Sequence, residues 1–286
     1  MSQPARDAVD KEKEMSERDA YQHGVPCWVE TLQPDPEGAM KFYGELFGWE
    51  FTGPGDMPGD PPGRYFGARL RGRDVAGIGS QPPAYAPPVP AWITHVSVDS
   101  ADEAAEETRR AGGEVVVDAF DALPVGRMAV LSDPAGAVFC AWEPRMRQGA
   151  QLVNEPSAWA MSMLNTPDPE GAKKFYGAVF GWETDTFDMG DGELTMWRVP
   201  GYIGGEPEQP VSREVVGVMA PAVGDDVAPH WSVNFWIDDA DRAAEKTARL
   251  DGSVVEPPHD LPGFREAVLA DPQGAIFSVS ELRPAG

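Results

Sequence analysis

The sequence predicts an α+β fold built as a tandem repeat of two domains. Residues 34–49 (PDPEGAMKFYGELFGW) and 167–182 (PDPEGAKKFYGAVFGW) are identical at 13 of 16 positions. Residues 131–139 (LSDPAGAVF) match 269–277 (LADPQGAIF) at 6 of 9. The matches occur in the same order, so one unit is written twice. A residue that the fold needs should occur in both copies, and a residue found in one copy is a better candidate for function.

The length of 286 residues agrees with two domains of ordinary size. We expect a flexible, solvated tail over residues 1–22, because this segment contains no hydrophobic run. The first domain should span 23–145 and the second 157–286, with a linker over 146–156.

Four helices are predicted from one shared spacing. In each, an aspartate that can accept the first free backbone amides stands thirteen residues before a glycine suited to the left-handed conformation after the last turn. The pairs are Asp35 and Gly48, Asp99 and Gly112, Asp168 and Gly181, and Asp239 and Gly252. In the first helix, Ala39, Phe42, Tyr43, Leu46 and Phe47 lie at helical spacing, which predicts a buried face.

Each predicted helix follows a strand-like run, and each second helix is followed by a hairpin. The runs are residues 27–32, 92–98, 158–165 and 231–237. DPAG at 133–136 and DPQG at 271–274 carry the signal of a type I turn. The order is therefore βαβββ, four times over. We expect each domain to pair two such modules into a curved mixed sheet around a cleft.

Charge and composition exclude several classes of partner. The net charge of −24 repels nucleic acid and anionic membranes, and it favours neutral or cationic ligands. No apolar run approaches the length of a membrane helix. Two cysteines cannot form a disulfide framework, so we expect a cytoplasmic location.

With these helices and hairpins, the chain resembles the vicinal oxygen chelate superfamily, which includes glyoxalase I, bleomycin-resistance proteins and extradiol dioxygenases. The resemblance rests on the D-x-x-x-A-x-x-F-Y-x-x-x-F-G-W helix, read from Asp35 and Asp168, and on the D-P-x-G-A-x-F hairpin. It covers residues 24–145 and 157–284 and is closest to tandem glyoxalase-like proteins. It implies the fold, but the superfamily uses that fold for isomerisation, ring cleavage and sequestration.

The resemblance also implies where metal ligands would lie. The three positions hold Trp28, Ile93 and Cys140 in the first copy, and Met161, Ser232 and Ser278 in the second. A hard divalent cation needs His or carboxylate ligands, and one thiol does not make a site. We therefore expect no metal and no other cofactor, unless a divalent metal uses a non-standard site.

Strand alternation extends the two cavity faces. The first should carry Trp28, Glu30, Ile93, His95, Cys140 and Trp142, and the second Met161, Met163, Ser232, Asn234, Trp236 and Ser278. Glu30 and His95 are candidate catalytic residues, because their counterparts are Met163 and Asn234. The candidate ligand-binding residues are Trp28, Ile93, Cys140, Trp142, Met161, Ser232, Asn234, Trp236 and Ser278. We expect ligand selectivity to reside in the first copy.

The leading functional hypothesis is metal-independent binding of a small apolar or aromatic metabolite, as in the resistance-type members of the superfamily. One alternative is a superfamily enzyme, of lyase, hydroxylase or dioxygenase-like activity, that uses Glu30 and His95. Another is a scaffold that assembles through exposed sheet surface. A homodimer is possible under each reading.

Overall fold

The computed structural model describes residues 16–57, 62–81, 90–188, 193–204, 214–221 and 228–283. The first copy contains β1 (Pro26–Gln33), α2 (Pro36–Phe47), β2 (Glu50–Met57), β3 (Gly63–Leu70), β4 (Arg73–Ser80), β5 (Trp92–Ser97), α3 (Ala101–Arg110), β6 (Glu114–Ala122), β7 (Gly126–Ser132) and β8 (Val138–Pro144). The second contains β9 (Trp159–Thr166), α4 (Pro169–Phe180), β10 (Glu183–Asp188), β11 (Glu193–Arg198), β12 (Val215–Pro221), β13 (His230–Trp236), α5 (Ala240–Arg249), β14 (Ser253–Leu261), β15 (Phe264–Ala270) and β16 (Ile276–Leu282).

Each copy forms one eight-stranded mixed sheet. The strand orders are β2-β3-β4-β1-β5-β8-β7-β6 and β10-β11-β12-β9-β13-β16-β15-β14. Within each sheet the two βαβββ modules join edge to edge, because their first strands pair antiparallel, β1 with β5 and β9 with β13. The predicted α+β tandem fold is confirmed.

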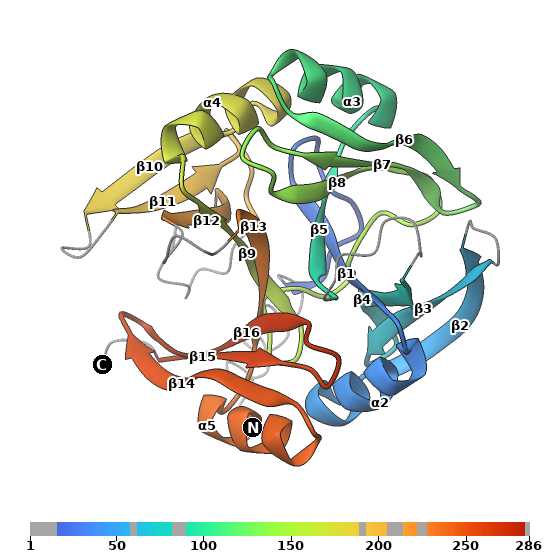
Figure 1. Cartoon of the computed structure of the whole chain (residues 1–286), viewed down its shortest axis with the longest axis vertical. Coiled ribbons are helices and arrows are strands. Elements are labelled where there is room, and N and C mark those ends of the chain that lie inside the picture. The colour runs from blue at the N-terminus through green and yellow to red at the C-terminus, as the bar shows by residue number, and fades with distance from the viewer. Residues whose placement is uncertain are drawn as a thin grey trace, which may run out of the picture.

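The two sheets lie back to back, with the helices at the outside of the molecule (Figure 1). Helix α2 of the first copy lies beside α5 of the second, and α3 lies beside α4. At the centre, Thr94 on β5 and Ser162 on β9 are hydrogen-bonded through their hydroxyl oxygens, 2.7 Å apart. Helices α2 and α4 each lie between their own sheet and the sheet of the other copy.

Both hydrophobic cores span the two copies. One places Phe42 and Phe47 of α2 against Phe235 and Phe277 of the second sheet, and the other places Phe139 of the first sheet against α4. Because one period-3.6 face must cover two sheets, the F-Y-x-x-x-F pattern recurs in α2 and α4.

A buried hydrogen bond joins the two repeated motifs across each core. The Tyr43 hydroxyl donates to Asp271 Oδ2 at 2.9 Å and accepts from Trp92 Nε1 at 3.0 Å. The equivalent Tyr176 hydroxyl donates to Asp133 Oδ2 at 3.2 Å. The repeated helix of each copy is thus hydrogen-bonded to the hairpin turn of the other.

Helix caps follow the prediction in part. Asp35, Asp168 and Asp239 are N-caps, and each accepts from a backbone amide three residues on. The prediction for Asp99 is wrong, because Ser100 caps α3 by accepting from Glu103 N. Gly48 and Gly181 end α2 and α4 in the left-handed conformation.

Of the two remaining glycine caps, one is as predicted. Gly112 has a left-handed φ of 89° and directly follows Ala111, the C-cap of α3. After α5 the left-handed residue is Asp251, with a φ of 62°, and not Gly252. Gly112 of the first copy therefore aligns with Asp251 of the second. The predicted pairing of Gly112 with Gly252 was one residue out of register.

The segment before β1 differs from the predicted solvated tail. Residues 1–15 lie outside the described residues, but Ser16–Gln22 pack against the linker. Glu17 forms an isolated bridge with Leu152, and Arg18 N donates to Gln151 O at 3.0 Å. The linker itself is buried at Ala150 and Leu152. Within the described ranges, no helix has the length and apolarity needed to cross a membrane.

Candidate functional site

The face of each sheet that points away from the other copy is the candidate site. We name these faces the first cup (first copy) and the second cup (second copy). In the first cup the register aligns Trp28, His95 and Cys140 in one row across β1, β5 and β8. In the second, Met161, Asn234 and Ser278 form the equivalent row across β9, β13 and β16. The predicted faces are therefore those found in the sheets.

The first cup contains a buried network centred on Glu30. His95 Nε2 lies 3.3 Å from Glu30 Oε1, so the two candidate residues meet. Tyr65 donates to Glu30 Oε2 at 2.7 Å and accepts from Trp28 Nε1 at 2.9 Å. The contact of His95 with Glu30 is an ion pair when the His95 ring is protonated, although neither ring nitrogen has a hydrogen-bond partner among the described residues.

Charge pairing stabilises the ionised state of both residues. Burial by itself raises the pKa of Glu30, but His95, the Tyr65 hydroxyl and Arg147 outweigh burial and lower that pKa below its usual value. Burial opposes charge on His95, but Cys140 and the Glu30 carboxylate outweigh it and raise the pKa of His95 well above 6.5. The pair therefore carries a cation and an anion at neutral pH.

Side chains fill the first cup. The Arg147 guanidinium lies 5.1 Å from the Trp28 ring centroid and 5.8 Å from that of Tyr65. Glycine at position 77 makes room for Tyr65, because a Cβ there would lie 1.9 Å from the hydroxyl oxygen. The side chains of His95 and Glu30 are 2% and 9% exposed. In this structure the pair lies beneath other side chains and is not open to a ligand.

The second cup is lined by partly exposed residues. Met161, Met163, Ser232, Asn234 and Trp236 alternate with fully buried neighbours along β9 and β13. Ser278 lies in the same row as Asn234 and is 8% exposed. At the position that matches Gly77, which makes room for Tyr65 in the first copy, the register places Val218. This cup therefore offers an accessible apolar surface that the first does not.

A polar network crosses the floor of the second cup. Asn234 Nδ2 donates to Ser278 Oγ at 2.7 Å and to Ser280 Oγ at 2.8 Å. Ser280 in turn donates to Glu266 Oε2 at 3.2 Å. Burial raises the pKa of Glu266 above its usual value, although Ser280 and His259 act in the opposite direction. The lining thus combines thioether and indole surface with a connected set of hydrogen-bonding groups.

Sequence reasoning missed Tyr65, Arg147 and Glu266. Tyr65 lies on a strand that was not located, and Arg147 lies in the linker. Glu266 could have been found from the sequence. It directly precedes the predicted strand residues Ala267–Leu269, and strand alternation places it on the same face as Val268. It also differs between the copies, since Met128 is its counterpart.

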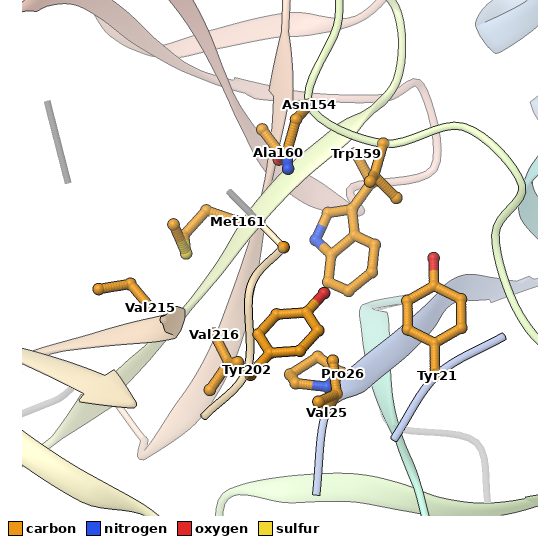
Figure 2. Close-up of a pocket in the computed structure, with 12 residues that line it drawn as sticks. Tyr21, Val25, Pro26, Asn154, Trp159, Ala160, Met161, Tyr202, Val215 and Val216 are labelled. Carbon is orange, nitrogen blue, oxygen red and sulfur yellow. The ribbon is translucent and has the colours of Figure 1, made fainter. Parts of the chain in front are cut away.

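A small pocket lies between the copies, next to the second cup. It has a volume of about 50 Å³ and is lined by Tyr21, Val25, Pro26, Val153, Asn154, Trp159, Ala160, Met161, Tyr202, Gly204, Val215 and Val216. Figure 2 shows the rings of Trp159, Tyr202 and Tyr21 around it, with Met161 at one side. Met161 belongs to both the pocket and the second cup.

The residues at the superfamily's metal positions do not fit a divalent cation. The first cup offers an indole, a hydrocarbon and one thiol at Trp28, Ile93 and Cys140, and the second offers a thioether and two hydroxyls at Met161, Ser232 and Ser278. In the part of the chain that the structure describes, no group of three His, Cys, Asp or Glu side chains is placed to hold a metal.

Comparison with known proteins establishes the family. The glyoxalase-like domain model matches residues 28–142 and 148–280, so the chain belongs to that family and contains its domain twice. The resemblance to the vicinal oxygen chelate superfamily is thereby confirmed.

Two relatives are similar over nearly their whole length. CFP32 of Mycobacterium tuberculosis, provisionally named a glyoxylase, is 38% identical over 275 residues, which cover 95% of this chain and 99% of the relative. The anthracycline biosynthesis protein DnrV of Streptomyces peucetius is 34% identical over 272 residues, which cover 91% and 94%.

Solved structures show the same fold at low identity. The Mn(II)-bound glyoxalase from Novosphingobium aromaticivorans has a TM-score of 0.60 at 16% identity, covering 91% of this chain and 82% of its own. BphC, a halotolerant catechol dioxygenase, has a TM-score of 0.58 at 13% identity, covering 91% and 87%. At such identities the likeness concerns the fold alone.

Proposed function

We propose that this protein binds a small apolar or aromatic molecule in the second cup, without the superfamily's metal. The observation that carries the proposal is the contrast between the cups. In the first, Trp28, Tyr65 and Arg147 cover the Glu30–His95 pair. In the second, the matching face is partly exposed.

The chemistry of the second cup suits such a ligand. Met161, Met163 and Trp236 supply adaptable, polarisable surface, on which a flat ring can pack. Asn234, Ser278 and Glu266 supply a few directional polar groups. Small-molecule sites typically combine an apolar lining with a small number of placed polar groups.

One relative indicates a ligand class. DnrV is named an anthracycline biosynthesis protein, and anthracyclines are planar polycyclic aromatics. A hydroxyanthraquinone such as alizarin is therefore a suitable first probe, since it presents a flat apolar surface with hydroxyl and carbonyl groups at its edge. Its neutral form also avoids repulsion by the net charge of −24.

The test exchanges the two linings. Asn234→His with Met163→Glu gives the second cup the residues of the first, and His95→Asn with Glu30→Met does the reverse. Alizarin at 100 times its Kd should stabilise the metal-free chain by about 2.7 kcal/mol. We expect the rise in Tm to vanish in the second-cup variant and to persist in the first-cup variant, each measured against its own ligand-free form.

The opposite result would relocate the site. If only the first-cup variant loses the rise in Tm, the ligand lies in the first cup, as the sequence alone predicted. If alizarin and related aromatics stabilise none of the proteins, the proposed function is wrong.

An enzyme is the second candidate, and Glu266 is the residue that favours it. Its carboxyl group faces the second cup, and burial raises its pKa above the usual value, which favours a role in proton transfer. The metal-free chain would then speed solvent-deuterium exchange at the α-carbon of 2-hydroxyacetophenone, and Glu266→Gln would abolish that exchange. Binding without exchange would leave the first candidate. The catalytic role of Glu30 and His95 stays a prediction.

A further inference from the structure

We propose that the pocket between the copies is a second binding site, which takes a small neutral group with a hydrogen-bond acceptor, such as an acetyl carbonyl, on the indole N–H of Trp159. The proposal extends the proposed function, because Met161 joins this pocket to the second cup. It can nevertheless fail or succeed separately.

The walls of the pocket select for a neutral group. None of the twelve described residues that line it has a charged side chain, and three are the aromatic residues Tyr21, Trp159 and Tyr202. The volume of about 50 Å³ exceeds what one water needs. It is well below the ~150 Å³ of an engineered cavity that binds benzene. The pocket therefore fits a group of a few atoms, and the rest of the molecule would extend past Met161.

Trp159 supplies the polar contact. It is 5% exposed, and its Nε1 has no hydrogen-bond partner among the described residues. A buried donor without an acceptor is costly, so an acceptor in the pocket would be favoured. In Figure 2 the indole nitrogen lies on the side of the ring nearer Met161. Because the positive end of the N–H dipole disfavours a cation, an acceptor oxygen suits the pocket better than a quaternary ammonium group.

The pocket is specific to the second copy's strand. Trp159 opens β9, and the matching first residue of β1 is Pro26, which has no donor and lines the same pocket from the other side. The two copies therefore contribute unlike residues to one site. Trp159 packs in a hydrophobic core, but the first copy has no equivalent indole at this position.

The segment before β1 holds the third wall in place. The Tyr21 hydroxyl donates to Ala150 O at 2.6 Å, and the Arg18 guanidinium donates to Gly204 O. Glu17 pairs with Arg73 at 2.8 Å. This segment thus ties the linker and both copies together around the pocket, so its aromatic walls are fixed before a ligand enters.

The test follows individual indole N–H signals of the full chain by ¹H–¹⁵N NMR. Trp159→Phe, Trp236→Phe and Trp197→Phe each remove one peak and so identify it. Trp159 reports the pocket, and Trp236 reports the second cup. Trp197 is the matched control, because its Nε1 is also buried without a described partner but does not line the pocket. The probe is acetophenone, and 2-phenylpropene is the isosteric compound without the acceptor.

We expect acetophenone to move the Trp159 peak downfield and to leave Trp197 unchanged, while 2-phenylpropene produces no such downfield shift. Trp159→Phe should weaken acetophenone binding by about 3- to 10-fold, as for the loss of one neutral hydrogen bond. An unmoved Trp159 peak would overturn the inference, whether or not Trp236 responds. A response to tetramethylammonium in place of acetophenone would also overturn it. A shift of the Trp159 peak without a shift of the Trp236 peak would support binding in the pocket and count against binding in the second cup.

Discussion

Tyr43→Phe should destabilise the whole chain, because Tyr43 links the two copies. The substitution keeps the ring and removes two buried hydrogen bonds, one to Asp271 Oδ2 and one from Trp92 Nε1. A bond to a charged group contributes about 1.5–3 kcal/mol and a neutral one about 0.5–1.5 kcal/mol. Gln33 still donates to the same Asp271 oxygen at 2.8 Å. We therefore expect the free energy of unfolding to fall by about 2–3 kcal/mol.

The assay is urea unfolding followed by both tryptophan fluorescence and far-UV circular dichroism. Tyr176→Phe is the matched variant at the opposite core; it removes the 3.2 Å bond to Asp133 and the 2.9 Å bond from Trp231 Nε1, so we expect a similar loss of about 2–3 kcal/mol. Each variant should shift one transition that both probes report together. Two separate transitions, or a loss below about 0.5 kcal/mol for Tyr43→Phe, would refute the reasoning that the copies form one cooperative unit.

Three further predictions concern the sequence signals themselves. Asp35→Ala and Asp168→Ala should each cost about 0.5–2 kcal/mol by urea unfolding, without changing the Kd of the ligand; a lost ligand with unchanged stability would show that the aspartate is functional. Wild type should lose stability relative to the variant with Glu30→Met and His95→Asn in two pH ranges. The pKa of Glu30 is lowered in the folded chain, so its contribution to stability is present above about pH 4.5 and is lost as the pH falls through the folded-state pKa. The pKa of His95 is raised in the folded chain, so its contribution is complete below about pH 6.5 and is lost as the pH rises towards the folded-state pKa. A difference that stays flat from pH 3 to 10 would contradict the ion pair. Gly77→Ala should cost about 1–3 kcal/mol, since its Cβ would lie 1.9 Å from a tyrosine hydroxyl; a neutral result by thermal melting would mean that the first cup is loosely packed.

The sequence predicted the elements whose signals are local. Helices α2 and α4 have the expected limits, because a capping aspartate, a proline at the first turn and a left-handed glycine act within one short segment. The hairpin turns also form as predicted, with Asp133 Oδ1 accepting from Ala135 N, Gly136 N and Ala137 N. Strands β2, β3, β4, β10, β11 and β12 were not located, since their Gly, Pro and charged residues mask the alternation.

The site could be predicted only as far as strand alternation reaches. It placed Glu30 and His95 on one face, but their meeting depends on the antiparallel register of β1 with β5. Whether a cup is open depends on residues far away in sequence. Tyr65 and Arg147 close the first cup from a third strand and from the linker, and no local pattern indicates that.

A crystal structure of the metal-free chain soaked with alizarin would show which cup binds the ligand. We expect density for the flat ring against Met161, Met163 and Trp236, with a hydroxyl or carbonyl oxygen in contact with Asn234, Ser278 or Glu266. Density in the first cup beside Glu30 and His95, or binding that appears only after a divalent metal is added, would contradict the proposed function.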